Sequence, residues 1–291
     1  MRMDIEKVKE FMRLFSQDVD SQLYLVGGAV RDLVLGFEPV DFDFCTPLTP
    51  EEVKDNLMRM GVFKKDIDMK ESRIGVVLVN YLGEQFEITT FRQETYAPGN
   101  RKPQVTFVKD LKLDLLRRDF TINAMAMDSK GEIHLPDGVT LTNLGTLKTV
   151  IPEATSFYQD PIRVLRGVRI GVKYKLEGVP RLINFCPNLV TVSLQSVRKE
   201  MEKGLKVQGT WRYYRFMMKD IVPYFNHAAH VVADFPYDAT PLEQWAFVAK
   251  HNISHTHFTP EQNEALIQRS FRMMEFSKSE IEEILRRVQN G

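Results

Sequence analysis

The sequence is poor in cysteine and has no excess of charge of either sign. Its 291 residues include two cysteines, Cys45 and Cys186. This excludes a disulfide-rich secreted scaffold and fits a reducing cytosol. Lysine plus arginine and aspartate plus glutamate both number 39. The net charge therefore predicts no nucleic-acid partner by itself, although a neutral total can hide a local basic groove.

Long hydrophobic runs are also missing. No stretch approaches the ~20 apolar residues that cross a bilayer. The first 15 residues alternate charged and apolar side chains, unlike the apolar core of a signal peptide. We therefore expect a soluble cytoplasmic protein without membrane contacts, and the sequence does not predict its oligomeric state. Its 43% hydrophobic and 27% charged residues are typical of a globular protein.

The pattern of secondary structure changes near residue 150. Before that point, helical and strand periodicities are mixed; after it, only helical periodicity and helix-capping boxes continue. The expected strands are 22–26, 40–46, 75–80, 85–91 and 105–108, and the expected helices include 5–15, 29–35, 160–172, 193–205, 210–221 and a last one ending near Gln289. The sequence thus predicts an α+β protein: a mixed sheet with helices, followed by an all-helical part.

Two aspartates on one expected strand are the first chemically informative feature. Asp41 and Asp43 are two residues apart, so their side chains would project from one face of the strand, about 6.5–7 Å apart. Val40, Phe42 and Phe44 would then face a core. Neighbouring carboxylates repel each other unless a cation lies between them, and Mg²⁺ prefers oxygen ligands. Taken alone, this pattern is more often a solvated edge strand.

A glycine pair precedes these aspartates. Gly27 and Gly28 separate the expected strand 22–26 from the expected helix 29–35. Glycines at such a turn let backbone N–H groups approach a phosphate closely, and the N-terminus of a helix favours anions. Most glycine pairs are only turns. A phosphate-binding turn next to a carboxylate pair is far more specific than either feature.

Several longer motifs resemble those of a known family. LVGGAVRDLVLG at 25–36 and DFDFCT at 41–46 resemble the signature of the class II tRNA nucleotidyltransferases (CCA-adding enzymes) and bacterial poly(A) polymerases, in the polymerase-β-like nucleotidyltransferase superfamily. RRDFTINAMA at 117–126 is similar to a second family motif, and DPIRVLRGVR at 160–169 to a third. EITTFR at 87–92 and Arg101-x-Pro103 agree in type and order. Together these motifs cover residues 23–205.

The resemblance implies a template-independent RNA nucleotidyltransferase that adds C and A (CCA) to the 3′ end of tRNA. CTP and ATP would be the substrates, pyrophosphate would be released, and two Mg²⁺ ions would act in catalysis. Asp41 and Asp43 would be the catalytic metal ligands, with Glu87 as a candidate third carboxylate, unless Glu87 is a cross-strand partner of a lysine or arginine. The implied nucleotide-binding residues are Gly27, Gly28, Arg31, Arg118, Asp119, Asn123, Asp160, Arg163, Arg166 and Arg169.

Two of the implied roles have specific chemistry. Asp119 is suited to accept a hydrogen bond from the ribose 2′-hydroxyl; alternatively, it caps the following helix, and Arg117 and Arg118 are surface charges. Asp160 and Arg163 are three residues apart and would share one helix face, where an acceptor beside a donor recognises the edge of cytosine or adenine. The alternative is a surface ion pair worth only ~0.3–0.5 kcal/mol.

The sequence departs from the family pattern at four positions. Gln159 stands where the family usually has Glu, and Asn143 replaces an Asp in the region implicated in the switch from C to A addition. Gln195 and Ser196 replace a Glu and an Arg of a later motif. These changes leave open a poly(A) polymerase, an enzyme that adds only CC or only A, and a catalytically inactive RNA-binding relative.

The resemblance also predicts how the chain is divided. Residues 1–150 would form the catalytic nucleotidyltransferase head, and residues 151–205 a helical neck that recognises the base. Residues 206–291 would form an RNA-binding helical body. Family members usually continue well beyond the position of Gly291, so we expect this body to be shortened.

Overall fold

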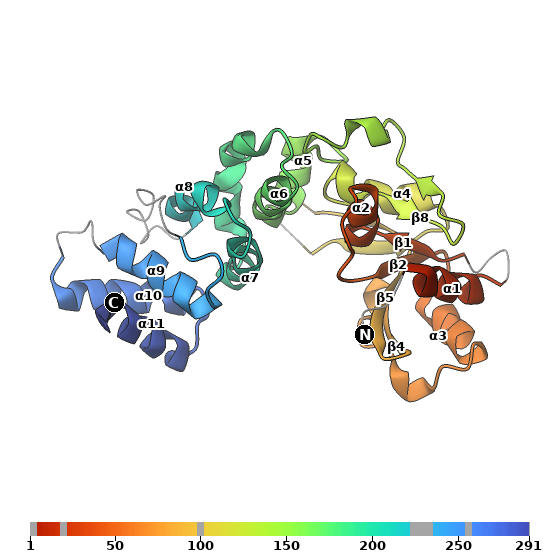
Figure 1. Ribbon diagram of the computed structural model, residues 1–291, viewed down its shortest axis with the longest axis horizontal. Helices are drawn as coiled ribbons and strands as arrows, with labels where there is room; N and C mark the ends of the chain where they lie inside the picture. The colour runs from red at the N-terminus through yellow and green to blue at the C-terminus, as the bar shows by residue number, and fades with distance from the viewer. Residues whose placement is uncertain (1–4, 18–21, 98–101, 222–234, 254–257, 291) are drawn as a thin grey trace. The chain divides into compact units, whose positions relative to one another are not determined.

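The computed structural model describes residues 5–17, 22–97, 102–221, 235–253 and 258–290 and divides the chain into two compact units (Figure 1). One unit comprises Met1–Leu144 and Lys148–Pro152, and the other comprises Gly145–Leu147 and Glu153–Gly291. The first contains a mixed sheet with helices, and the described part of the second is helical. This confirms the predicted α+β class. Among the described residues, no helix is both long and apolar enough to span a bilayer.

The first unit is built on a seven-stranded sheet. In spatial order its strands are β3 (Ile67–Asp68), β4 (Val76–Tyr81), β5 (Glu84–Thr90), β2 (Asp43–Thr46), β1 (Tyr24–Val26), β8 (Ala126–Met127) and β9 (Ile133–His134). The pair of β2 and β5 is parallel, and the other pairs are antiparallel. A separate hairpin consists of β6 (Arg92–Thr95) and β7 (Gln104–Phe107). The helices are α1 (Ile5–Phe15), α2 (Gly28–Val34), α3 (Pro50–Arg59) and α4 (Leu111–Leu116), with short 3₁₀ turns at Lys64–Asp66, Ser72–Ile74, Thr121–Asn123 and Leu141–Asn143.

Different helices cover the two faces of this sheet because side chains alternate along each strand. Phe44 of β2 points toward α1, where its ring centroid lies 5.5 Å from that of Phe11. The next residue, Cys45, points to the opposite face and packs with Leu115 of α4. Asp43 is two residues before Cys45 and therefore lies on the same face as α4.

The described part of the second unit consists of helices around an aromatic core. These are α5 (Glu153–Gln159), α6 (Ile162–Lys173), α7 (Leu194–Leu205), α8 (Trp211–Ile221), α9 (Pro241–Ile253), α10 (Pro260–Met273) and α11 (Lys278–Asn290), with a long 3₁₀ segment at Val179–Thr191. Trp211, Tyr214 and Trp245 are fully buried. The hydroxyl of Tyr214 donates to the carbonyl of Leu165 at 3.1 Å and so ties α8 to α6.

Three expected elements begin two or more residues later than predicted, the first being the strand expected at 22–26, which begins at Tyr24. The strand predicted from Val40 starts at Asp43, because β1 pairs with β2 only as far as Val26 and the chain then turns at Gly27. Val40 is 60% exposed, so the expectation that it faces the core is wrong. The helix predicted from residue 160 begins at Ile162, since a residue before proline disfavours helical backbone angles.

The aromatic packing under the sheet gives a test of the fold. Phe11→Ala should lower the free energy of unfolding by about 3–5 kcal/mol, because it removes a fully buried ring from the core. Leu14→Ala on the same helix removes a side chain that is 38% exposed and should cost about 0.5 kcal/mol or less. Urea unfolding measures both. Equal losses in the two variants would contradict the assignment of the buried face of α1.

Candidate active site

The three predicted carboxylates lie near the start of β2 and along β5. Asp43 is the first residue of β2, and in the parallel pair it is directly opposite Glu87 of β5. Asp41 lies in the segment that leads into β2, so the two aspartates do not share one strand as predicted. All three are exposed. The residues paired with Glu87 are Asp43 and Leu78, which does not support the alternative that it faces a cation across the strands.

The carboxyl group of Asp43 has an unusual proton affinity. Although solvent reaches the side chain, partial desolvation, followed by repulsion from Glu87 and Asp41, raises its pKa from 3.8 to about 6, while Arg118 acts in the opposite direction. Carboxylates that lie close together repel one another when they are ionised, and a cation between them removes this repulsion. Carboxylate oxygens are the ligands that hard divalent ions prefer. The donor set therefore fits a divalent metal.

A glycine turn lies beside these carboxylates. Gly27 follows β1 directly and has φ 68° and ψ −128°, a conformation that side chains disfavour. A Cβ atom on Gly27 would lie 3.6 Å from Nη1 of Arg118, and one on Gly28 would lie 3.4 Å from Nη2 of Arg31. Since Gly27 precedes α2, two guanidinium groups line the turn between β1 and this helix.

A chain of hydrogen bonds holds one of these arginines. Nη1 of Arg31 donates to Oδ1 of Asn123 at 2.7 Å, and Nδ2 of Asn123 donates to Oδ1 of Asp119 at 3.0 Å. Nε and Nη2 of Arg31 both donate to Oδ1 of Asp32. The structure thus brings Arg31, Asn123 and Asp119, three of the predicted nucleotide-binding residues, together at the turn.

Asp119 also has a structural role. It is only 7% exposed, and its Oδ1 accepts the backbone N–H of Phe120 at 2.7 Å, just before the 3₁₀ turn Thr121–Asn123. The alternative that Asp119 caps the following helix is not borne out, because Phe120 precedes this 3₁₀ turn and no side chain caps it; Asp119 instead holds the N–H of Phe120. Its role in ribose recognition stays a prediction.

Arg118 and Arg117 are not surface charges, so that alternative is wrong. Their side chains are 15% and 16% exposed, and both pair with the fully buried carboxylate of Asp114 on α4. The sequence interpretation missed Asp114. The available signal was its spacing, because an acid three and four residues before two arginines faces both of them on a helix.

The predicted base-recognition pair lies in the second unit, at the joint between α5 and α6. Asp160 precedes α6 rather than belonging to it, its Oδ1 accepts the N–H of Ile162 at 3.4 Å, and its carbonyl accepts the N–H of Arg163 at 3.0 Å. Their joint role in base recognition stays a prediction. Arg163 is 5% exposed, and its Nη1 donates to Oγ of the buried Ser156 at 2.9 Å. Arg163 is therefore held in place by α5.

The other two predicted arginines of α6 face a glutamate of α7. Nε of Arg169 lies 2.7 Å from Oε1 of Glu200, and Nε of Arg166 lies 4.0 Å from its Oε2. Because Glu200 is 5% exposed, these contacts tie the two helices together. Nucleotide binding by Arg166 and Arg169 stays a prediction. Of the family departures, Ser196 lies in the first turn of α7 and donates its backbone N–H to Oγ of Ser193, the residue that caps this helix, at 3.3 Å.

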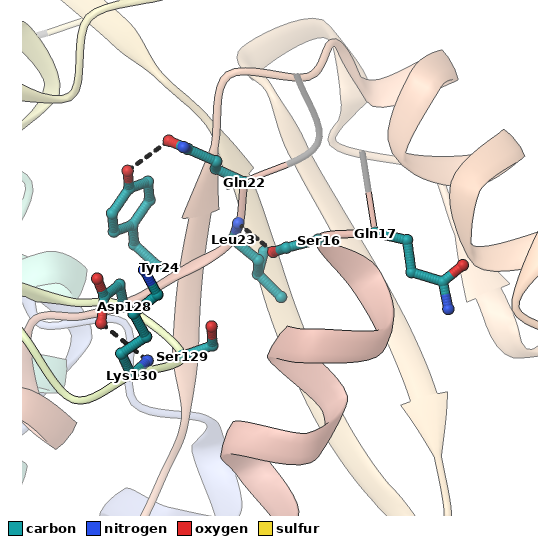
Figure 2. Close-up of a pocket in the computed structure, with 8 residues that line it drawn as sticks. All are labelled: Ser16, Gln17, Gln22, Leu23, Tyr24, Asp128, Ser129 and Lys130. Atoms are coloured by element: carbon teal, nitrogen blue, oxygen red, sulfur yellow. Dashed lines mark hydrogen bonds between the residues drawn. The ribbon is translucent and has the colours of Figure 1, made fainter. Parts of the chain in front are cut away.

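A pocket lies at the opposite end of β1 from the glycine turn. Figure 2 shows its lining, and its volume is about 290 Å³. The lining residues are Ser16, Gln17, Gln22, Leu23, Tyr24, Asp128, Ser129 and Lys130. None of them was predicted as a site residue. Tyr24 closes one side by donating its hydroxyl proton to Gln22.

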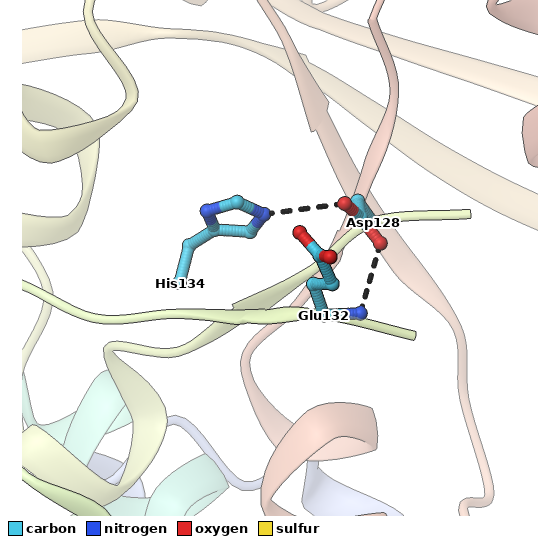
Figure 3. Close-up of side chains that lie close together, drawn as sticks. All are labelled: Asp128, Glu132 and His134. Carbon is cyan, nitrogen blue, oxygen red and sulfur yellow. Dashed lines mark hydrogen bonds and ion pairs between the residues drawn. The ribbon is translucent and has the colours of Figure 1, made fainter. Parts of the chain in front are cut away.

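A second group of metal-type ligands lies on the β8–β9 hairpin. The ligand atoms of Asp128, Glu132 and His134 all lie within 4.8 Å of one another (Figure 3). Asp128 is already engaged in the turn, because its Oδ1 accepts the N–H groups of Lys130 and Glu132, while its Oδ2 lies 3.5 Å from Nε2 of His134. This group therefore closes the hairpin. The three predicted metal-ligating carboxylates, Asp41, Asp43 and Glu87, are not gathered so tightly in the described part of the chain.

The raised pKa of Asp43 predicts how stability depends on pH in metal-free buffer. The folded protein holds this proton more tightly than the unfolded chain, so the associated stability is present below pH 3.8 and is lost as the pH rises to about 6. Asp43→Asn should therefore be more stable than the parent at pH 8, by on the order of 1 kcal/mol after allowance for solvent screening. Thermal melts with EDTA should show the difference at pH 8 and none near pH 3.5. A destabilised variant at pH 8 would contradict the repulsion.

Comparison with known proteins agrees with the motifs and the geometry. Residues 23–140 match the poly A polymerase head domain family. The CCA-adding enzyme of Enterococcus faecalis is 39% identical over 197 residues, which is 65% of this chain and 47% of that protein. The CCA-adding enzyme of Leuconostoc mesenteroides is 34% identical over 221 residues, 74% of this chain and 53% of that protein. The chain spans about half the length of these curated relatives.

Solved structures show the same likeness over more of the chain. The crystal structure of the Bacillus stearothermophilus CCA-adding enzyme in complex with CTP aligns with a TM-score of 0.79 at 26% identity, covering 100% of this chain and 71% of that chain. The Thermotoga maritima CCA-adding enzyme complexed with tRNA aligns with a TM-score of 0.64 at 22% identity over 97% of this chain and 70% of that one, a likeness of fold alone. The family head domain, the motifs and the fold agree, and the chain belongs to the class II family of CCA-adding enzymes and bacterial poly(A) polymerases.

Proposed function

We propose that this protein is a template-independent nucleotidyltransferase that adds C and A to the 3′ end of tRNA from CTP and ATP. The observation that carries the proposal is the register of β2 and β5, which places Asp43 opposite Glu87, near the glycine turn. The names of the relatives, which are CCA-adding enzymes, support the choice of reaction.

The carboxylates would hold the metal. Members of this family generally use divalent ions, and here Asp41, Asp43 and Glu87 offer oxygen donors whose mutual repulsion a cation relieves. We propose that they hold two Mg²⁺ ions. Bound there, such ions would activate the 3′-hydroxyl of the RNA and stabilise the departing pyrophosphate.

The cationic groups at the turn would bind the triphosphate. Gly27 and Gly28 leave the backbone open to a close approach, and Arg31 and Arg118 line the same turn. Asn123 fixes Arg31 through the bond to its Nη1, so this guanidinium is oriented before the substrate arrives. A cationic side chain that is already ordered loses less conformational entropy on binding than one that has to be ordered by the substrate.

Asp160 and Arg163 would select the base. A carboxylate accepts from the exocyclic amino groups of cytosine and adenine, and a guanidinium donates to their ring acceptors. Uracil would be rejected, because its O4 is an acceptor that faces the carboxylate and its N3–H is a donor that faces the guanidinium. The bond from Arg163 to Ser156 supports the proposal, because it orients the guanidinium through the protein itself, so that no template strand is needed.

Primer extension tests the reaction. Full-length protein with Mg²⁺ should extend a tRNA that lacks its 3′ CCA by two C and one A when CTP and ATP are both present. The double variant Asp41→Ala/Asp43→Ala should lose at least 10³-fold in rate, since it removes the proposed metal ligands. A growing A tail with no use of CTP would identify a poly(A) polymerase, and addition of CC or A alone would identify a partial enzyme. RNA binding without incorporation would indicate an inactive relative.

Base selection has its own test. Asp160→Asn introduces an amide N–H₂ that donates to O4 of uracil, so incorporation of UTP relative to CTP should rise at least about tenfold. Competition between the two nucleotides on the same primer measures this ratio. Asp238→Asn, the same change at an exposed aspartate of the second unit, is the matched control and should leave the ratio unchanged. An unchanged ratio in Asp160→Asn would remove Asp160 from base selection.

A further inference from the structure

Asp114 is a completely buried carboxylate that none of the predicted roles uses. Its Oδ1 accepts the backbone N–H of Arg92 at 3.2 Å and Nε of Arg117 at 2.9 Å. Its Oδ2 accepts Nη2 of Arg118 at 2.9 Å. The two oxygens thus have different partners: Oδ1 bonds to the start of the β6–β7 hairpin and to Arg117, and Oδ2 bonds to Arg118, the arginine beside the glycine turn.

The opposite side of Arg118 faces the candidate active site. Its Nη1 is the atom nearest to a Cβ placed on Gly27, at 3.6 Å. Its Nε is buried and has no hydrogen-bond partner within the described structure. The charge of this guanidinium acts on Asp43 and lowers the pKa of that carboxyl group against the stronger effects that raise it. Arg118 therefore lies between an anion that anchors it and anions that are proposed to hold the metal.

An anchor is needed in this position. A desolvated guanidinium costs several kcal/mol unless an anion compensates it. Without Asp114, the carboxylates that still act on Arg118 are those of Asp119 and Asp43, and pairing with Asp43 would occupy a proposed metal ligand. Asp114 sits on α4, whose Leu115 is packed under the sheet, so the anchor cannot follow the arginine.

We propose that Asp114 is a positioning residue for nucleotide binding: it holds Arg118 so that Nη1 is presented to a phosphate at the Gly27 turn and is kept away from the metal-binding carboxylates. The proposal rests on the proposed function, since it takes Arg118 to be a ligand of the triphosphate. Asp114 itself touches no substrate. Its effect should therefore appear only in ligands that carry phosphate.

Isothermal titration of the full chain with CTP and Mg²⁺ tests this role. Asp114→Asn keeps the shape of the side chain, and its remaining oxygen still accepts from Arg92 and Arg117, but its amide faces the donor of Arg118. The Kd for CTP should rise at least about tenfold, whereas the Kd for cytidine, measured by NMR titration, should stay within about twofold. Equal weakening of CTP and cytidine, or no weakening of CTP, would overturn the proposal.

The same network offers a matched control. Glu94 of β6 is a second buried carboxylate, with an 8% exposed side chain that accepts from Arg92 and Arg117 but is not paired with Arg118. Glu94→Gln should leave the Kd for CTP within about twofold of the parent value. A loss as large as that of Asp114→Asn would mean that the whole ion cluster acts structurally, and it would overturn the specific role of Asp114.

A double-mutant cycle gives a second, independent measurement. If Asp114 acts through Arg118, then Asp114→Asn should add no further loss of CTP affinity to Arg118→Gln. Additive losses would overturn the proposal. Should Asp114→Asn fail to fold, as judged by its thermal melt, Arg118→Lys replaces it, since one ammonium group cannot reach both Asp114 and the turn. Parent-like CTP binding by Arg118→Lys would refute the proposal.

The proposed function fails separately. If the parent binds CTP and Asp114→Asn weakens it, but no tRNA is extended, the positioning role stands and the reaction is wrong. If tRNA is extended and Asp114→Asn binds CTP as the parent does, the reaction stands and the positioning role is wrong. A parent chain that binds no CTP refutes both.

Discussion

Repulsion among carboxylates is the constraint on which the head of this protein depends. Parallel pairing sets Asp43 opposite Glu87, with Asp41 two residues away, and partial desolvation followed by repulsion from these two carboxylates raises the pKa of Asp43. The sheet tolerates it because the next residue, Phe44, faces an aromatic core with α1. Phe44, on one face of β2, thus stabilises the fold. Asp43, the first residue on the other face, is held in an unfavourable environment that a bound cation would make favourable.

The cations around this group are kept in place by anions of their own. Arg31 is bound by Asp32 and Asn123, and Arg118 by Asp114. The charge of each arginine is therefore already compensated by an aspartate, Asp32 or Asp114, that lies outside the group of metal-binding carboxylates. Opposite charges can lie close together in a polar site without collapsing onto one another when each has a fixed partner outside the site.

Local sequence signals predicted much of the fold. The apolar spacing of residues 5–15 predicted a helix that the structure confirms as α1, because this signal acts within a few residues. The start of β2 was wrong because it depends on where its neighbour β1 ends. The hairpin strand β6 and the 3₁₀ segment Val179–Thr191 were missed, since both depend on tertiary contacts rather than on periodicity.

The site shows the same division. The glycine turn and the aspartate pair were visible as motifs, and the structure places them next to each other. The pairing of Asp43 with Glu87 required the order of the strands in the sheet. The spacing of Asp114 could indicate its pairing with Arg117 and Arg118, but its burial depends on how α4 packs against the sheet. The helix expected from Asp160 begins at Ile162, and Asp160 instead lies in the turn before it, where its carbonyl accepts the N–H of Arg163 at 3.0 Å.

The position of Cys45 has a consequence for the chemistry of the thiol group. It lies two residues after Asp43 but on the side packed under α4, where it is completely buried. Burial, together with Asp114, raises the pKa of this thiol, against the opposing effect of Arg118 and Arg117. The sulfur is therefore neither a thiolate nor within reach of solvent. Oxidants, alkylating agents and soft metal ions reach Cys45 only when the first unit opens locally. The rate at which Cys45 is modified therefore reports how often this opening occurs.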